Sequence, residues 1–230
     1  AAHYVGFIGE QAYAYGFAFR NVAHGLCLPL LDRPERFAPS DRALDCELSA
    51  ATVKDRIGLY DTVILGGAWR RPIMRFPDFL PALGDTLATL REQGKQVILL
   101  GRVPYIEGFD AECGTKALKL GFLDCAARKT VPLSEVEEYN EPLRTLAERH
   151  GALYYDLTDL LCNNGACSGY ADGKPLYRDA GHIGMQASVY LGRLALQDDK
   201  AKRVFSTLSG NVAGGRPTAP PWHDESTGTR

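Results

Sequence analysis

Short apolar runs alternate along most of this chain with longer segments in which apolar side chains recur at helical spacing. The apolar runs are typical of buried strands and cover residues 4–8, 62–65, 96–100 and 153–156. The segments with helical spacing are residues 11–23, 48–59, 79–93, 134–150 and 183–196. Short strands that alternate with longer helices predict a parallel sheet covered by helices on both faces.

Glycines and polar residues mark the ends of several predicted elements. Gly66 and Gly101 each follow an apolar run directly. Ser134 and Glu137 have the spacing of a capping box, and Gly151 is placed to end the helix that they begin. Residues 28–45 are rich in proline and charge and are predicted to form a loop.

The periodicity stops after residue 196. Residues 197–230 hold glycine, proline, serine, threonine and charged residues without a repeating pattern. We therefore expect one domain over residues 1–196 and a flexible tail over residues 197–230, without a role in chemistry.

Composition narrows the class of protein further. A length of 230 residues, 45% hydrophobic, is compatible with one soluble α/β domain. The net charge of -2 gives no reason to expect a nucleic-acid partner. No apolar run approaches the ~20 residues of a membrane span, and no signal peptide opens the sequence, so we expect a mature domain or a piece of a longer protein.

The six cysteines fall in three sequential pairs. Disulfides between neighbours would join Cys27 to Cys46, Cys113 to Cys125, and Cys162 to Cys167. The last pair brackets a turn-forming sequence, residues 163–166, that can bring the two sulfurs together. Free buried cysteines are the alternative. A metal site is not indicated, because no Cys-x-x-Cys occurs and no histidine lies near the pairs.

Asp179 and His182 are the clearest candidates for chemistry. An aspartate three residues before a histidine lets one short turn present both side chains at one point. The carboxylate can then hold one imidazole nitrogen while the other faces a substrate, as in the base and orienter of a Ser-His-Asp hydrolase. Asp-x-x-His also occurs in ordinary surface turns, so a hydrolase needs a nucleophile and an oxyanion site elsewhere in the chain.

Further motifs accompany this pair. Residues 66–69 read Gly-Gly-Ala-Trp after a buried strand, and residues 101–105 read Gly-Arg-Val-Pro-Tyr after the next. Residues 154–188 lead through Cys162 and Cys167 to the Asp-x-x-His. Together with Gly-Leu-Cys-Leu-Pro at residues 25–29, these motifs resemble the periplasmic SGNH domain fused to multi-pass membrane acyltransferases that O-acetylate bacterial surface glycans. The resemblance covers about residues 4–196.

The resemblance implies a three-layer α/β/α, flavodoxin-like SGNH hydrolase fold with a parallel sheet and a Ser-Asp-His triad. It places the serine in a Gly-Asp-Ser after the first strand, where this chain has Gly9, Glu10 and Gln11. On this alignment Gln11 holds the nucleophile position, and Gly9, Gly67 and Ala68 form the oxyanion region, with Ala68 in place of the usual asparagine. An amide cannot form the acyl-enzyme of serine chemistry, and a lost oxyanion donor costs about 10²–10³ in rate.

Two functions follow from the resemblance. The first is an O-acyltransferase domain that moves an acetyl group to a sugar hydroxyl, with another serine (Ser40, Ser49 or Ser168) as nucleophile, or with His182 acting directly on the hydroxyl. The second is an inactive pseudo-enzyme that binds glycan or docks a partner. A third class, a nucleotide-binding domain, lacks the expected Gly-x-Gly-x-x-Gly.

The remaining expectations concern the substrate groove and the surroundings of the domain. Trp69, Arg70 and Tyr105 are candidates to line a sugar groove, although Trp69 could equally be half buried beside solvated charges. The resemblance implies a carbohydrate substrate, no cofactor and no metal. It also implies a periplasmic location, with a membrane acyltransferase domain in the same chain or a partner chain.

Overall fold

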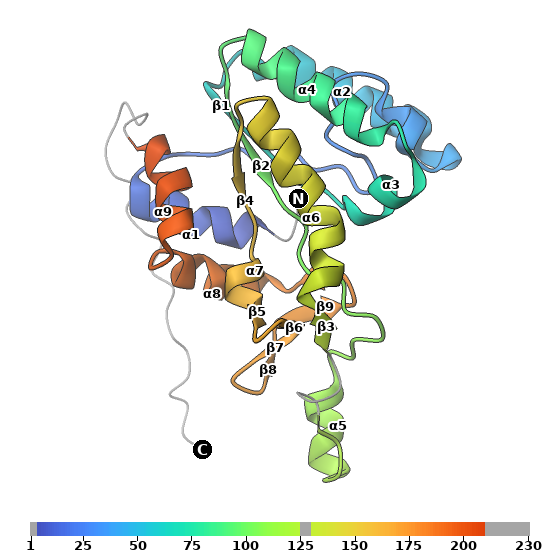
Figure 1. The fold of residues 1–230 in the computed structure, drawn as a ribbon, viewed down its shortest axis with the longest axis vertical. Coiled ribbons are helices and arrows are strands. Elements are labelled where there is room, and N and C mark those ends of the chain that lie inside the picture. The colour runs from blue at the N-terminus through green and yellow to red at the C-terminus, as the bar shows by residue number, and fades with distance from the viewer. Residues whose placement is uncertain (1–3, 125–129, 210–230) are drawn as a thin grey trace, which may run out of the picture.

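The computed structural model describes residues 4–124 and 130–209 of the chain. At its centre lies a parallel sheet of three strands in the order β1-β2-β4 (Figure 1). These strands are β1 Thr62–Leu65, β2 Gln96–Leu100 and β4 Leu153–Tyr155. Val63 pairs with Val97, and Leu99 pairs with Tyr154. The three predicted strands after residue 60 are therefore confirmed, with the last one residue shorter than expected.

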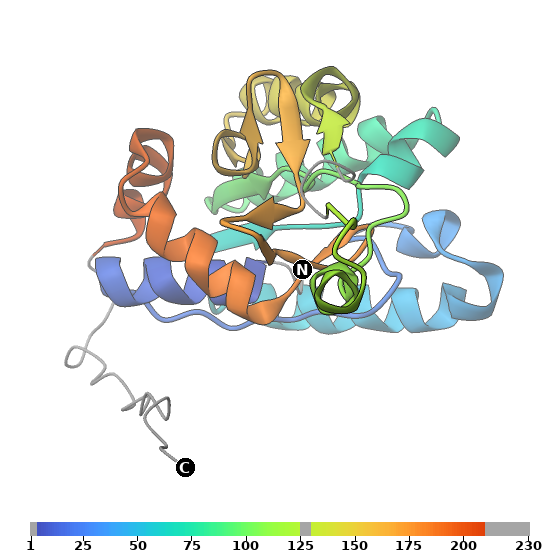
Figure 2. The same ribbon diagram turned by 90° about the horizontal axis from the view of Figure 1, so that it is seen from below.

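Helices cover both faces of this sheet, as the alternation predicted (Figure 2). Side chains of β2 point alternately into two hydrophobic cores: Val97 and Leu99 into one, Ile98 and Leu100 into the other. The first core is closed by α4 Phe79–Glu92 and α6 Leu133–Arg149. The second is closed by α1 Val5–Tyr15, α8 Met185–Ala195 and α9 Asp199–Phe205.

The expected strand over residues 4–8 is wrong: these residues form the start of helix α1. The buried positions Phe7, Ile8, Gln11 and Ala12 recur at helical spacing and face one side. A run of five apolar residues fits either a buried strand or a buried helix segment, so periodicity alone could not separate the two. The helix ends at Gly16, whose positive φ of 72° favours glycine, and not at residue 23.

Several other boundaries differ from the predictions. The remaining helical elements are η2 Pro34–Phe37, η3 Ser40–Arg42, α2 Ala43–Ile57, α3 Arg70–Arg75, α5 Cys113–Lys119, α7 Thr158–Leu161 and η4 Ser206–Leu208. Residues 28–45 are thus only partly loop. No side chain caps α6, where a Ser134–Glu137 capping box was expected, whereas Gly151 follows its end with a positive φ.

Short antiparallel strands lie outside this sheet, and the last two of them carry the expected site. They are β3 Thr130–Pro132, β5 Cys162–Asn163, β6 Ala166–Ser168, β7 Tyr170–Ala171, β8 Lys174–Pro175, β9 Tyr177–Asp179 and β10 His182–Ile183. Strands β9 and β10 pair with each other across a tight turn at residues 180 and 181. We call residues 177–183 the dyad hairpin.

Two of the three predicted disulfides are present. Cys27 is bonded to Cys46, which joins the loop before η2 to α2. Cys162 is bonded to Cys167, which closes the turn between β5 and β6. The predicted Cys113–Cys125 pair includes residue 125, which lies outside the described residues.

The folded structure continues beyond residue 196, so the expected flexible tail is wrong for residues 199–209. Asp198 caps α9 by accepting hydrogen bonds from the backbone of Lys200 and Ala201. Phe205 is fully buried and its ring packs against those of Phe7 and Tyr155. The helix is short, so its few apolar positions gave little periodic signal. Residues 210–230 lie outside the described part of the chain.

Replacing Phe205 with Ala tests whether α9 belongs to the domain. Loss of this buried ring should lower the free energy of unfolding by about 3–5 kcal/mol, measured by urea denaturation. Arg203→Ala, an exposed change on the same helix, serves as control and should alter stability by less than about 0.5 kcal/mol. Equal effects of the two variants would show that α9 does not contribute to the core.

Candidate functional site

Asp179 and His182 form the hydrogen-bonded pair that their spacing predicted. Nδ1 of His182 lies 2.6 Å from Oδ1 and 2.9 Å from Oδ2 of Asp179. The backbone N–H of Gly181 donates to Oδ1 of Asp179 at 3.0 Å. Both side chains are 48% exposed. Because the carboxylate engages Nδ1, the Nε2 atom is the nitrogen that can exchange a proton with a substrate.

The carboxylate of Asp179 is held in its charged form. Partial burial opposes ionisation, but the hydrogen bonds from Gly181 and His182, together with the positive charges of His182 and Arg178, lower its pKa below the usual range. An ionised aspartate accepts hydrogen bonds only, so it fixes the imidazole with its proton on Nδ1 when the ring is neutral.

The dyad hairpin lies against the loop that follows β2, at the carboxyl end of the parallel strands. The N–H of Ile106 donates to the carbonyl of Ala180 at 2.8 Å, and the hydroxyl of Tyr177 donates to the carbonyl of Pro104 at 2.9 Å. Arg102, which sequence analysis did not single out as a site residue, reaches the carbonyl of Gly181. The carboxyl edge of a parallel sheet is where ligands bind in this class of fold.

The amino end of α1 meets the same edge. The hydroxyl of Tyr4 donates to the carbonyl of Gly101 at 2.8 Å, and the Tyr4 ring lies beside Gly66. The Phe7 N–H donates to Ser188 Oγ in the first turns of α8. Since α8 starts three residues after His182, the start of α1 lies beside the loop that carries the imidazole.

Gln11 does not stand where a nucleophile would, which corrects the alignment made from the sequence. It lies inside α1 with no exposed surface, and its Nε2 donates to the carbonyl of Gly192 at 2.7 Å, two turns along α8 from the dyad hairpin. Gly9 lies in the middle of the same helix and not after a strand. Both assignments depended on the wrong strand at residues 4–8.

Gly67 and Ala68 do follow a strand, β1, at the carboxyl edge of the sheet. Gly67 has no room for a side chain, because a Cβ there would lie 2.9 Å from the Trp69 ring. Trp69 itself is fully buried, and its Nε1 donates to the carbonyl of Leu100 at 2.7 Å. The expectation that Trp69 lines a sugar groove is therefore wrong.

Arg70 and Tyr105, by contrast, come together beside the dyad hairpin. The Arg70 guanidinium lies over the Tyr105 ring, 5.0 Å from its centroid, and 3.9 Å from Glu135. The Tyr105 ring also lies against Gly181, because a Cβ at that glycine would be 3.2 Å from the ring. Ser168, by comparison, accepts a hydrogen bond from the Tyr170 N–H within a strand connection.

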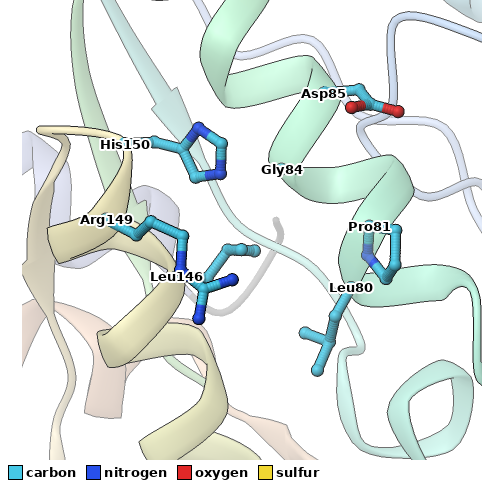
Figure 3. A pocket seen from close by; sticks show the side chains of 7 residues that line it. All are labelled: Leu80, Pro81, Gly84, Asp85, Leu146, Arg149 and His150. Atoms are coloured by element: carbon cyan, nitrogen blue, oxygen red, sulfur yellow. The ribbon is translucent and has the colours of Figure 1, made fainter.

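A pocket of about 260 Å³ lies between α4 and α6 and is lined by Gly84, Leu146 and His150, among others (Figure 3). No residue of the dyad hairpin lines this pocket. Within residues 4–124 and 130–209, no cluster of metal-binding side chains occurs and no helix is long and apolar enough to cross a membrane.

An Asp-His pair at the carboxyl edge of a parallel three-layer α/β fold is the arrangement of an SGNH domain. A family model described as an SGNH domain fused to AT3 domains matches residues 1–197, and the chain belongs to this family. The resemblance drawn from the motifs is therefore confirmed.

Comparison with solved structures supports the same fold. The periplasmic domain of a lipopolysaccharide acetyltransferase from Salmonella ser. Paratyphi A is similar, with a TM-score of 0.58 and 15% sequence identity. The match covers 84% of this chain and 77% of that one. At this identity the likeness shows the fold alone. No curated protein matches the chain.

Replacing His182 with Ala should raise the pKa of the Asp179 carboxyl toward the ordinary value of about 3.9, because it removes a hydrogen bond and a positive charge. In the native protein a lowered pKa stabilises the folded state at pH values above the ordinary one, and this contribution is lost as pH falls through the folded-state pKa. Carboxyl ¹³C NMR titration would measure the change, with His150→Ala as control. A pKa that is the same in both variants would show that the pair does not couple.

Proposed function

We propose that this chain is the extracytoplasmic SGNH domain of a glycan O-acyltransferase, with His182 as general base and Asp179 as its orienter. The observation that carries the proposal is the Asp179–His182 pair, in which Nδ1 of His182 lies 2.6 Å from Oδ1 of Asp179. The family's fusion to AT3 domains supports a membrane acyltransferase partner, in the same or another chain. A periplasmic location and a surface glycan as acceptor are inferred from the similarity to the periplasmic domain of a lipopolysaccharide acetyltransferase.

The chemistry has two steps, and in each of them Nε2 takes up one proton and gives it back. In the first, a nucleophile hydroxyl attacks the carbonyl of an acyl donor while Nε2 of His182 takes its proton. The tetrahedral intermediate collapses when that proton passes to the leaving group. In the second, a sugar hydroxyl gives its proton to Nε2 and attacks the acyl-enzyme, which releases the O-acylated glycan and returns the proton to the nucleophile. Asp179 stabilises the imidazolium formed in each step.

The place for the nucleophile is the amino end of α1. That end lies at the carboxyl edge of the sheet beside the start of α8, as the Tyr4–Gly101 and Phe7–Ser188 hydrogen bonds show. A strand-to-helix turn directly before α1 would bring a hydroxyl toward His182. Within the described residues β1 pairs with β2 on one side only, so its other side is open to a strand that leads into such a turn. Residues 1–3 are Ala-Ala-His and hold no serine, so we infer that a serine from a segment outside residues 1–230 supplies the nucleophile at this place.

Substrate recognition is assigned to the neighbours of the dyad hairpin. The partly exposed Arg70 and Tyr105 can contact sugar hydroxyls beside His182. Gly67 and Ala68, at the end of β1, offer backbone N–H groups to a developing oxyanion. The chemistry needs no metal and no cofactor, because an imidazole base and a serine suffice for acyl transfer.

A binding module without catalysis is the second candidate, favoured by the exposed Ala68, which offers no side-chain donor where the family has asparagine. Gln11 no longer supports it, because that residue is a buried helix position. A direct attack by a sugar hydroxyl, with His182 as base and no serine, is compatible with the same pair.

An amino-terminal extension tests the place of the nucleophile. We would add an apolar strand segment followed by Gly-Asp-Ser directly before Ala1, and measure p-nitrophenyl acetate hydrolysis. The expected result is turnover that is lost in a Gly-Asp-Ala extension and after His182→Ala, since losing serine or histidine costs about 10⁶ in a serine triad. Gln11→Ser without the extension should stay inactive, because its hydroxyl would face Gly192.

Three outcomes separate the candidates. Turnover that depends on both the added serine and His182 supports the proposal. Turnover that depends on His182 but not on the serine indicates direct base catalysis. Background hydrolysis in every variant, with all of them folded by circular dichroism, would contradict the enzyme and favour the binding module.

A further inference from the structure

The dyad hairpin is held by a part of the molecule that the proposed reaction does not use. Three hydrogen bonds among the described residues tie it to the loop after β2: Tyr177 Oη to the Pro104 carbonyl, Ile106 N to the Ala180 carbonyl, and Arg102 Nη2 to the Gly181 carbonyl at 2.7 Å. The first bond acts on β9 before the turn, and the second acts on the first residue of the turn. The third acts on the residue between Asp179 and His182 that donates to the carboxylate.

Arg102 is an unusual residue for such a position. It is 6% exposed, although arginine is rarely buried without a structural or functional reason. Burial lowers the pKa of its guanidinium, while the nearby phenols of Tyr177, Tyr139 and Tyr4 and the carboxylate of Asp179 favour the charged form. A buried cation therefore lies within electrostatic range of the carboxylate that orients the imidazole.

The backbone of Arg102 is fixed from the opposite side. Asn140, a fully buried residue of α6, accepts from the Arg102 N–H at 2.8 Å and donates to the Arg102 carbonyl at 3.0 Å. The amide thus engages both backbone groups of one residue. A continuous path of hydrogen bonds runs from the core helix α6 through Arg102 to Gly181 and the dyad.

Gly181 completes this arrangement because it leaves room for the guanidinium. A Cβ at Gly181 would lie 2.7 Å from Arg102 Nη2 and 3.2 Å from the Tyr105 ring. The φ of Gly181 is not in the left-handed region, so the glycine is required here by space and not by backbone conformation. The Arg102 guanidinium therefore fits against the turn because residue 181 has no side chain.

We propose that Arg102 is the positioning residue of the site: by holding the Gly181 carbonyl it fixes the turn in which Asp179 selects one tautomer of His182. The proposal rests on His182 being the base of the proposed function. Arg102 acts on the site through the Gly181 carbonyl and is assigned no contact with the substrate. Its contribution is the geometry of the Asp179–His182 hydrogen bond, for which a misplacement of about 1 Å can cost 10² in rate.

The test uses ¹⁵N NMR of histidine in the full chain, at a pH where the imidazole is neutral. The native protein should show the signature of a single tautomer of His182, with the proton on Nδ1 and no proton on Nε2. Arg102→Met and Gly181→Ala each break the contact from one side, and both should give averaged shifts of two exchanging tautomers. Arg102→Lys keeps a donor and should restore the native signature in part.

A matched control distinguishes this effect from the loss of any arginine. Arg91 donates to the Lys95 carbonyl at 3.1 Å, an exposed bond of the same chemistry at the far end of the sheet. Arg91→Met should keep the native tautomer signature. If Arg102→Met does not fold, Gly181→Ala decides, since it leaves the buried cation in place. A native signature in a folded Arg102→Met or Gly181→Ala variant would overturn the proposal.

A kinetic measurement complements the NMR result. In the chain extended with Gly-Asp-Ser, Arg102→Met should lower kcat by about 10- to 100-fold with little change in KM, and the double variant with Gly181→Ala should be no slower than the slower single one. An inactive extended parent would count against the proposed function alone, because the tautomer experiment requires no turnover.

Discussion

Burial of β2 on both faces is the constraint on which this structure depends. Ile98 and Leu100 belong to one hydrophobic core and Val97 and Leu99 to the other, and all four are almost completely buried. A strand covered on both sides cannot shift its register without moving apolar side chains out of both cores. The residues that follow it, from Gly101 to Ile106, therefore leave the sheet at a fixed point. The dyad hairpin and the start of α1 are both hydrogen-bonded to that loop. The position of this short central strand therefore fixes where the parts of the site lie.

The features that the sequence predicted well are those in which a local pattern and the tertiary structure agree. Three strands, the helices over residues 79–93 and 134–150, and the Asp179–His182 pair each carry their own signal, because periodicity or a four-residue spacing suffices to define them. Two disulfides belong to the same group, since Cys162 and Cys167 bracket a turn. In each of these cases the local sequence alone indicates the element or the pairing, and contacts with distant segments do not change it.

The features that the sequence could not predict depend on distant contacts. Residues 4–8 form an unbroken apolar run, and in the fold they begin a helix that packs against α8. Trp69 was assigned to a groove because tryptophan can stack on sugars, but its indole N–H finds the Leu100 carbonyl inside the core. Arg102 followed a strand without any motif of its own, and its role depends on Asn140 and Gly181, 38 and 79 residues away. One wrong strand at the amino end was enough to place a nucleophile on Gln11.

The close contact between α1 and α8 has a consequence for how the reacting groups keep their distance. At Gly6 a Cβ would lie 2.9 Å from Val189, and at Gly192 it would lie 2.9 Å from both Phe7 and Glu10, so the two parallel helices touch almost backbone to backbone at both glycines. The amino ends of these helices carry the proposed place of the nucleophile and the loop of His182, the proposed base. Because α1 and α8 are in such close contact, we expect a displacement of one helix to carry the other with it. The distance between the proposed nucleophile and His182 is then set by the packing of α1 on α8, and small deformations of the sheet change it little.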